Sequence, residues 1–169
     1  MTSPHIGAVV PGFVVPVIDE RAVRAAAAIL FLAGAVGFGL AAATGTVRPL
    51  QPFGMVFMID MYLRVAVGDR WSPTLALGRF LVRRLPPDWV GAPQKAFAWW
   101  LGFRLAVVSC ASSGLLAAPL GLTLALCAVC LSLLFIEAAF GICAGCTLQR
   151  VFSRASPHHC SGDACAVHT

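Results

Sequence analysis

The sequence predicts an all-α integral membrane protein, a bundle of four transmembrane helices with a short amphipathic interfacial helix between the second and the third. Charged residues make up only 11% of the 169 residues, whereas a soluble domain usually needs about a quarter. Lipid must therefore cover most of the surface. Four long apolar stretches support this view, and the length fits one compact bundle without a second folded domain.

Each of the four apolar segments is long enough to cross a bilayer. The first runs from Ala25 to Thr44, and about 20 residues of helix cover a hydrocarbon core of about 30 Å. The second runs over residues 49–67 and the third over residues 96–117. The fourth runs over residues 122–150, roughly 43 Å as a straight helix, so it is expected to tilt or to project beyond the lipid. Together they define a transmembrane domain over residues 21–152.

Two shorter stretches are predicted to lie at the membrane surface. Residues 7–18 are apolar but interrupted by two prolines, so residues 1–20 form an N-terminal interfacial segment. Residues 72–85 resemble a capped amphipathic helix, with Ser72 as the N-cap. Such a helix suits an anionic membrane surface. Arg79 and Arg83 turn away from its apolar face, which consists of Leu77, Phe80, Leu81 and Leu85.

Basic residues gather on one side of the four-helix arrangement, whereas the other side has only Arg48. The positive-inside rule places the basic side, and both termini, in the cytoplasm, with the bundle in the inner (plasma) membrane. These residues border apolar segments and form no basic face, so no nucleic-acid partner is expected. They are Arg21, Arg24, Arg64, Arg70, Arg79, Arg83, Arg84, Lys95, Arg150 and Arg154.

Four ionisable residues fall inside the apolar segments, where charge is costly. Asp60 and Arg64 are four residues apart on one helix and are expected to pair. Arg104 and Glu137 are expected at similar depths on the third and fourth helices, which predicts an interhelical ion pair. One interpretation is a structural clasp, with snorkelling of Arg104 as a variant. The other is a polar site beside a proton or ion path.

Seven cysteines are many for this length. Two C-x-x-C pairs, at 127/130 and 143/146, imitate a four-cysteine zinc site. In one continuous helix they would lie about 24 Å apart, too far for one metal ion. Cys127 and Cys130, within Leu- and Ala-rich sequence, are interpreted as small hydrophobic residues. Cys143 and Cys146 lie near water and share a helix face, which suits a disulfide or a shared soft metal.

The tail over residues 153–169 is predicted to be flexible and is rich in cysteine and histidine. Such ligands suit Zn(II) or Cu(I), and the tail is long enough to reach back to the Cys143–Cys146 pair. A polar tail with incidental histidines is the alternative. The metal-ligand candidates are Cys143, Cys146, His158, His159, Cys160, Cys165 and His168.

Four stretches together resemble a bacterial membrane-protein family catalogued as domain of unknown function 4395. They are Asp19–Arg24, Arg64–Arg84, Pro93–Ala98 and Glu137–Cys146. The resemblance covers roughly residues 17–152, and its most specific part is the Phe-Gly-x-Cys-x-Gly-Cys motif that ends at Cys146. Thr-Leu-Gln follows the motif where family members often have an aromatic residue. The resemblance implies a small helical membrane domain and carries no activity; the tail lies outside it.

No catalytic triad, phosphate loop or nucleotide motif is visible, and three functions fit the residues. The leading interpretation is a cytoplasm-facing thiol site that binds a soft metal ion or carries sulfur. Its expected partners are the lipid bilayer, a soluble thiol or metal-carrier protein, and a second copy of the chain. The first alternative is a thiol–disulfide relay in which Cys110, Cys127 and Cys130 form an outer group of thiols. The second is a structural membrane subunit whose cysteines only pack.

Overall fold

The computed structural model describes residues 6–114 and 118–141. Within them, four helices are long and apolar enough to cross a membrane, as the sequence predicts. The second span passes from an α-helical part into a π-helical turn. The described helices are α1 (Glu20–Thr44), α2 (Leu50–Tyr62), the π-helix η1 (Leu63–Val67), the 3-10 turn η2 (Asp69–Trp71), α3 (Pro73–Val82), α4 (Ala92–Gly114) and α5 (Leu120–Phe140).

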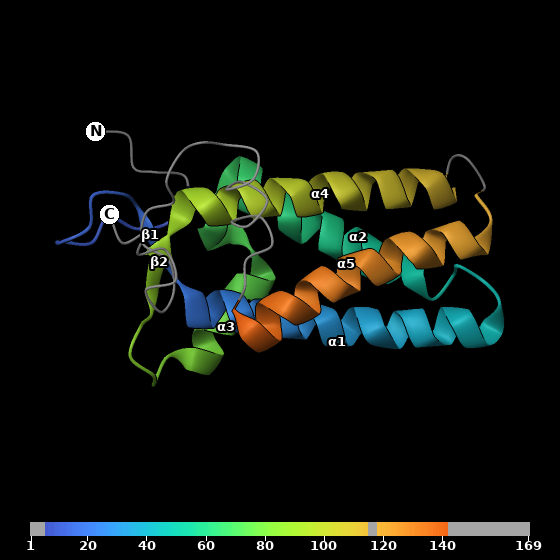
Figure 1. Cartoon of the computed structure of the whole chain (residues 1–169), viewed down its shortest axis with the longest axis horizontal. Helices are drawn as coiled ribbons and strands as arrows, with labels where there is room; N and C mark the ends of the chain where they lie inside the picture. The colour runs from blue at the N-terminus through green and yellow to red at the C-terminus, as the bar shows by residue number, and fades with distance from the viewer. Residues whose placement is uncertain (1–5, 115–117, 142–169) are drawn as a thin grey trace, which may run out of the picture.

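The four long helices pack side by side, with α3 and a small sheet gathered at one end (Figure 1). α1 packs mainly against α3 and α5 and less extensively against α2, and α4 packs against α2 and α5. The end that holds α3, the starts of α1 and α4 and the end of α5 is here called the charged end, because buried ion pairs lie there. The opposite end, with the α1–α2 and α4–α5 connections, is called the loop end.

The sequence of α1 explains where it begins, where it ends and how closely it packs. Asp19 caps its start, with Oδ1 accepting an N–H of the first turn at 3.1 Å. Gly45 ends it at a φ of 68°, a left-handed conformation that glycine adopts at little cost. In the middle, a Cβ on Gly34 would lie 2.6 Å from side-chain atoms of both Leu131 and Phe53. Glycine therefore lets α1 approach α5 and α2 closely.

A short antiparallel sheet lies at the charged end, where the sequence predicts only an interfacial segment. Strand β1 (Val17–Asp19) pairs with β2 (Trp89–Gly91), with Val17 opposite Gly91. Val17 and Ile18 are buried, so this part of residues 7–18 belongs to the packed end of the bundle. Strands of three residues are too short for an alternating pattern to reveal them.

α3 is the predicted amphipathic helix, and it packs against α1. Ser72 caps it as expected, with Oγ accepting the N–H of Leu75 at 3.2 Å. Gly78 lies against the backbone of α1, and a Cβ there would come within 2.4 Å of the Ala22 carbonyl oxygen. The predicted apolar face is exposed on the outside of the bundle, where Leu77, Phe80, Leu81 and Leu85 are each about half exposed.

α5 ends earlier than the sequence predicts. It stops at Phe140, and Gly141 takes a left-handed φ of 66° while its N–H bonds the Glu137 carbonyl at 3.0 Å. Such a glycine cap terminates a helix. The expectation of one continuous helix over residues 122–150 is therefore wrong. Cys143, Cys146 and the whole 153–169 tail lie outside the described residues.

Candidate functional site

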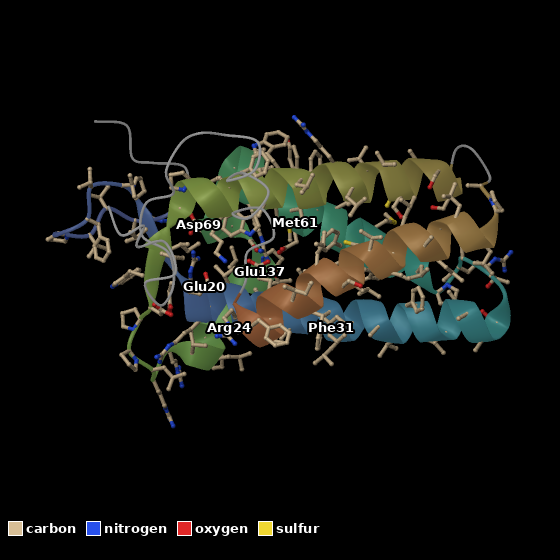
Figure 2. The ribbon with its side chains drawn as sticks, in the orientation of Figure 1. Glu20, Arg24, Phe31, Met61, Asp69 and Glu137 are labelled. Carbon is tan, nitrogen blue, oxygen red and sulfur yellow. The ribbon has the colours of Figure 1, made fainter. Side chains whose placement is uncertain are left out.

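Lys95 joins three helices at the charged end. Its Nζ lies 2.7 Å from Glu20 Oε2 and 3.0 Å from Glu137 Oε1. Glu20 opens α1, Lys95 lies in the first turn of α4, and Glu137 lies in the last turn of α5; Figure 2 shows the two carboxylates. The side chains of Lys95 and Glu20 are only 3% and 1% exposed. Breaking such a buried pair costs about 3–5 kcal/mol, so these contacts hold the three helix ends together.

Arg104 does not belong to this group, and the predicted Arg104–Glu137 pair is wrong. Lys95 and Glu137 each lie three residues from a helix end at the charged end of the bundle. Arg104 is nine residues further along α4, roughly 13 Å at 1.5 Å per residue. It is exposed, and its guanidinium carbon lies 5.9 Å from the ring centroid of Trp100. This geometry fits the snorkelling alternative.

The predicted pair between Asp60 and Arg64 is confirmed, and both residues are buried. Arg64 Nη2 lies 2.8 Å from Asp60 Oδ2, with side chains 3% and 0% exposed. The guanidinium carbon of Arg64 also lies 5.1 Å from the ring centroid of Trp99 on α4. The pair therefore links α2 and its π-helical turn to α4, and it leaves neither charge alone in the low-dielectric interior.

Asp60 also fixes the start of α3. Its Oδ1 accepts the Ser72 hydroxyl at 2.7 Å and the Thr74 N–H at 3.2 Å. Its Oδ2 accepts the Thr74 hydroxyl at 2.8 Å, and Thr74 Oγ1 in turn accepts from Arg64 at 2.6 Å. A carboxylate at a helix N-terminus is favoured by the helix dipole and by the free N–H groups there. Arg64 belongs to the π-helical turn, a feature that often occurs at functional sites.

A small cavity of about 60 Å³ lies between these two groups of charges. Arg64, Trp99 and Glu137 line it, together with apolar residues of α1, α2, α4 and α5. Trp99 is 2% exposed, and its Nε1 has no hydrogen-bond partner among the described residues. A cavity of this size exceeds the roughly 10–15 Å³ that one water needs, and its polar groups suit a water.

The two groups hold five charged side chains. Glu20, Asp60 and Glu137 carry carboxylates, whereas Lys95 and Arg64 are cationic. Four of the five are buried, and the side chain of Glu137 is 15% exposed. The arrangement therefore brings carboxylates and cations together beside a water-sized cavity.

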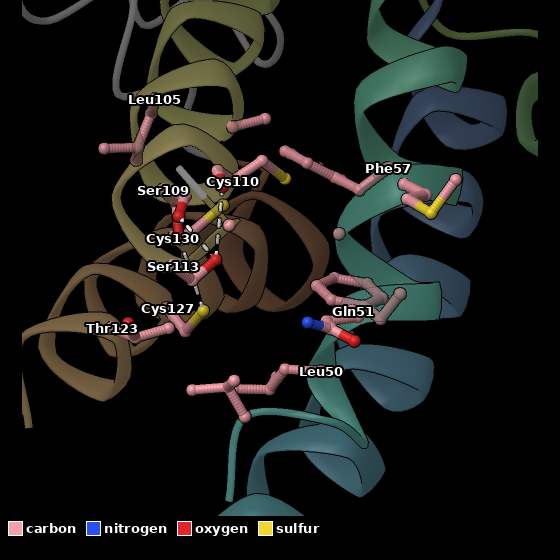
Figure 3. A pocket seen from close by; sticks show the side chains of 16 residues that line it. Leu50, Gln51, Phe57, Leu105, Ser109, Cys110, Ser113, Thr123, Cys127 and Cys130 are labelled. Atoms are coloured by element: carbon pink, nitrogen blue, oxygen red, sulfur yellow. Dashed lines mark hydrogen bonds between the residues drawn. The ribbon is translucent and has the colours of Figure 1, made fainter. Parts of the chain in front are cut away.

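A larger cavity of about 240 Å³ lies toward the loop end, between α2, α4 and α5 (Figure 3). Three thiols line it, one from α4 and two from α5. The hydroxyl of Ser109 lies 3.8 Å from the sulfur of Cys127, which shows that α4 and α5 approach closely beside it. The thiols are Cys110, Cys127 and Cys130, and all three are free.

The two cavities adjoin each other inside the bundle. Phe57, Leu105 and Cys130 line both of them. Cys127 and Cys130, which the sequence suggests are packing residues, both line the larger cavity. Because Cys130 lies on the wall between the cavities, it connects the thiol-lined space to the small cavity beside Glu137.

The end of α5 is held by an arginine of α1. Arg24 Nε donates to the Ala138 carbonyl at 3.2 Å, and Nη2 donates to the Ala139 carbonyl at 2.8 Å. These carbonyls belong to the last turn of the helix, where the carbonyl groups have no intrahelical N–H donors. A positive charge there also opposes the negative end of the helix dipole. Together with the Lys95–Glu137 pair, Arg24 fixes the position of the last turn of α5.

The predicted metal ligands are not among the residues that the structure describes. They are Cys143, Cys146, His158, His159, Cys160, Cys165 and His168. Within residues 6–114 and 118–141, no group of three or more cysteine, histidine, aspartate or glutamate side chains is placed to hold a metal ion.

Several residues of these groups cannot be assigned from the sequence alone. Glu20 and Lys95 have the pattern of charges that flank a helix, because their pairing depends on where three separate helices end. The sequence indicates that Ser72 is a helix cap but not that it bonds Asp60. The available signal is position, since Glu20 and Lys95 both border apolar segments on the basic side of the four-helix arrangement.

Comparison with known proteins gives a match to a family. No curated protein and no solved structure matches the chain. A match to a family extends over residues 18–154, which includes α1 through α5 and the segment with Cys143 and Cys146. Because this match takes in most of the chain, the protein belongs to the family described as Domain of unknown function (DUF4395).

Proposed function

We propose that this protein handles a soft metal ion, or sulfur, at a thiol site formed by Cys143 and Cys146 at the charged end of the bundle. The ligands on the tail would be His158, His159, Cys160, Cys165 and His168, and the metal would be Zn(II) or Cu(I), which such ligands prefer. A protein of this kind would act as a transporter, a chaperone or a sensor.

The observation that carries the proposal is the anchored end of α5. Gly141 precedes Cys143 by only two residues, and a Cβ at Gly141 would lie 3.4 Å from the Arg24 side chain. The Glu137–Lys95 pair and the Arg24 hydrogen bonds hold the preceding turn firmly. A metal site benefits when its first ligands start from a rigid element, because less conformational freedom is lost on binding.

Charge supports the same site. A thiolate is stabilised by a neighbouring arginine, and Arg24 lies at the point from which the cysteine segment begins. Binding of a metal cation would add a larger positive charge and release the thiol protons. In our proposal this end faces the cytoplasm, with both termini there and the bundle in the inner membrane. A soluble thiol or metal-carrier protein would then be its partner, and a second copy of the chain another.

Metal analysis of the purified protein tests the proposal. We expect Zn(II) or Cu(I) to copurify, and we expect Cys143→Ser combined with Cys146→Ser to lower the metal content at least several-fold. Removing the residues after Arg154 should weaken binding further without unfolding the bundle. Cys127→Ser combined with Cys130→Ser is the matched control, with the same spacing on α5, and should leave the metal content unchanged. The proposal would be refuted if the protein purifies without metal. It would also be refuted if metal copurifies but its content stays unchanged in the Cys143→Ser, Cys146→Ser variant.

A second candidate function, a thiol–disulfide relay, is favoured by the thiol-lined cavity. Cys110, Cys127 and Cys130 come from two helices and line one space, which brings three thiols to a common cavity. Thiol trapping on rapidly acidified cells separates the two functions. An oxidised Cys143–Cys146 pair in metal-free protein would favour the relay over the metal site. If the cysteines are reduced and metal-free, and their replacement has no effect, the remaining function would be that of a structural membrane subunit.

A further inference from the structure

We propose that the cavity between α2, α4 and α5 binds the head ring of a quinone taken up from the bilayer. The cavity is the larger one, toward the loop end (Figure 3). This inference is independent of the proposed site at Cys143 and Cys146, because none of its residues lines this cavity among those that the structure describes. It concerns binding alone.

The volume suits a substituted ring. The cavity measures about 240 Å³. An apolar cavity of about 150 Å³ inside a protein is large enough to stay dry and bind benzene. The additional space in this cavity would take the substituents of a benzoquinone. It is too small for a complete lipid, so a larger molecule would place only one part there.

The lining favours an uncharged ligand that accepts hydrogen bonds. Among the described residues, no Asp, Glu, Lys, Arg or His lines the cavity, so a charged ligand would lose its hydration without an opposite charge from them. Yet the wall is not purely aliphatic. It contains the amide of Gln51, hydroxyls from α4 and α5, and three thiols. An acyl chain makes no use of these groups, whereas the carbonyl oxygens of a quinone accept hydrogen bonds from them.

Thr123 gives a second indication of a ligand. It lines the cavity and is 3% exposed, and its hydroxyl has no hydrogen-bond partner among the described residues. The usual acceptor for such a hydroxyl is the backbone carbonyl one turn earlier, which here belongs to Pro119. That carbonyl already accepts the N–H groups of Leu122 and Thr123. A buried hydroxyl without a partner is destabilising. A carbonyl oxygen in the cavity would supply that partner once the side chain takes a rotamer that directs the hydroxyl toward it.

The cavity is accessible from the side of the bundle. Met55, on the α2 side of the cavity, is 58% exposed, and Gln51, one turn away, is also exposed. Both belong to a helix that is long and apolar enough to span a membrane, so in this proposal the exposed side of the cavity faces lipid. A molecule dissolved in the bilayer could therefore place its ring inside the cavity and leave its chain in the lipid.

Protection of Cys110 from alkylation tests the proposal. The other six cysteines are replaced by serine, so no disulfide can form and any loss of labelling reports occupancy. The full-length protein is placed in lipid nanodiscs and treated with N-ethylmaleimide, with or without decylubiquinone, whose fully substituted ring does not alkylate thiols. We expect saturating decylubiquinone to slow labelling of Cys110 at least tenfold. Decanol, which has the same chain without the ring, should give little protection.

Two matched variants of α4 show whether the protection comes from the cavity. Ala106 lines it and is 5% exposed, whereas Val108 is 55% exposed on the lipid side of the same helix. We expect Ala106→Phe to abolish protection by decylubiquinone and Val108→Phe to preserve it. If Ala106→Phe does not fold, Gly54→Val replaces it, since a Cβ at Gly54 already lies 3.2 Å from the Cys110 sulfur.

The outcomes separate the possible occupants. Equal protection by decanol would show that an acyl chain fills the cavity and would overturn the proposal. Protection that persists in a folded cavity-filled variant, or no protection at all, would also overturn it. The assay protein lacks Cys143 and Cys146, so its result does not depend on whether the metal site exists.

Discussion

Lys95 is the residue on which the charged end of the bundle most depends. Glu20 and Glu137 approach it from two different helices. Without Lys95 they would be two like charges facing each other in a buried place. Its own helix does not favour it, because a lysine in a first turn meets the positive end of the helix dipole. The two carboxylates therefore account for its position.

Replacing Lys95 should be far more damaging than replacing the other cation of α4. We expect Lys95→Met to lower the free energy of unfolding by about 3–5 kcal/mol, the usual cost of breaking a buried pair. Arg104→Met should change it by less than about 0.5 kcal/mol, as at an exposed site. Thermal unfolding in detergent or nanodiscs measures both.

A double-mutant cycle identifies the partner of Glu137. We expect Glu137→Gln and Lys95→Met to be non-additive, because the two side chains touch. Glu137→Gln and Arg104→Met should be additive, because these residues lie at different depths. Coupling to Arg104 and independence from Lys95 would contradict the arrangement described above.

α3 illustrates how one glycine allows an element to dock. The helix buries Thr74, Leu75 and Gly78 and exposes its apolar face on the outside. Its start is held by Asp60, and its middle lies against the backbone of α1 at Gly78. Arg79 also forms an ion pair with Asp69 in the turn before the helix. The exposed face is then free to meet lipid.

A methyl group at Gly78 should loosen this contact. The Cβ would come within 2.4 Å of a carbonyl oxygen of α1, and backbone cannot yield as a side chain can. We expect Gly78→Ala to reduce stability by about 1–3 kcal/mol, the usual cost of overpacking. Gly39→Ala on α1 is the control, since nothing lies within 4 Å of its Cβ. Equal melting temperatures for the two variants would show that α3 does not dock through Gly78.

The elements were predicted well where hydropathy decides them and poorly where tertiary contacts do. The four spans follow from long apolar runs, and Ser72 marks the start of α3 as a cap. The strands are too short to leave a pattern. The early end of α5 was missed because the apolar run continues, although Gly141 after Phe140 is the usual signal of a helix end.

Across the whole molecule, local spacing predicted one buried pair and long-range packing decided the rest. Asp60 and Arg64 lie one helical turn apart, so sequence alone reveals them. Glu20, Lys95 and Glu137 come from three helices, and their meeting depends on the depth at which each helix ends. The cavity of Cys110, Cys127 and Cys130 likewise needs the packing of three helices. No periodic pattern of apolar residues in the sequence indicates such a cavity.

The orientation of the bundle remains a prediction that follows from its charge asymmetry. Arginine and lysine residues concentrate at the charged end, and Arg48 lies in the α1–α2 connection at the loop end. Positively charged connections are retained in the cytoplasm. Several of these cations are not free to drive orientation, since Lys95 and Arg64 are paired and buried. The exposed residues Arg70, Arg83 and Arg84 should therefore carry the signal.

Reporter fusions test this orientation. A fluorescent protein that matures only in the cytoplasm, fused after Thr169, should fluoresce. Alkaline phosphatase, which is active only outside the cytoplasm, should be active when inserted after Arg48 and inactive at Thr169. Replacing Arg70, Arg83 and Arg84 with glutamine should produce a mixed orientation, because the asymmetry then rests on fewer exposed charges, whereas Arg104→Gln, within the span of α4, should not. Phosphatase activity at Thr169 in the unaltered protein would place the charged end outside, and a reducing environment for Cys143 and Cys146 could no longer be assumed.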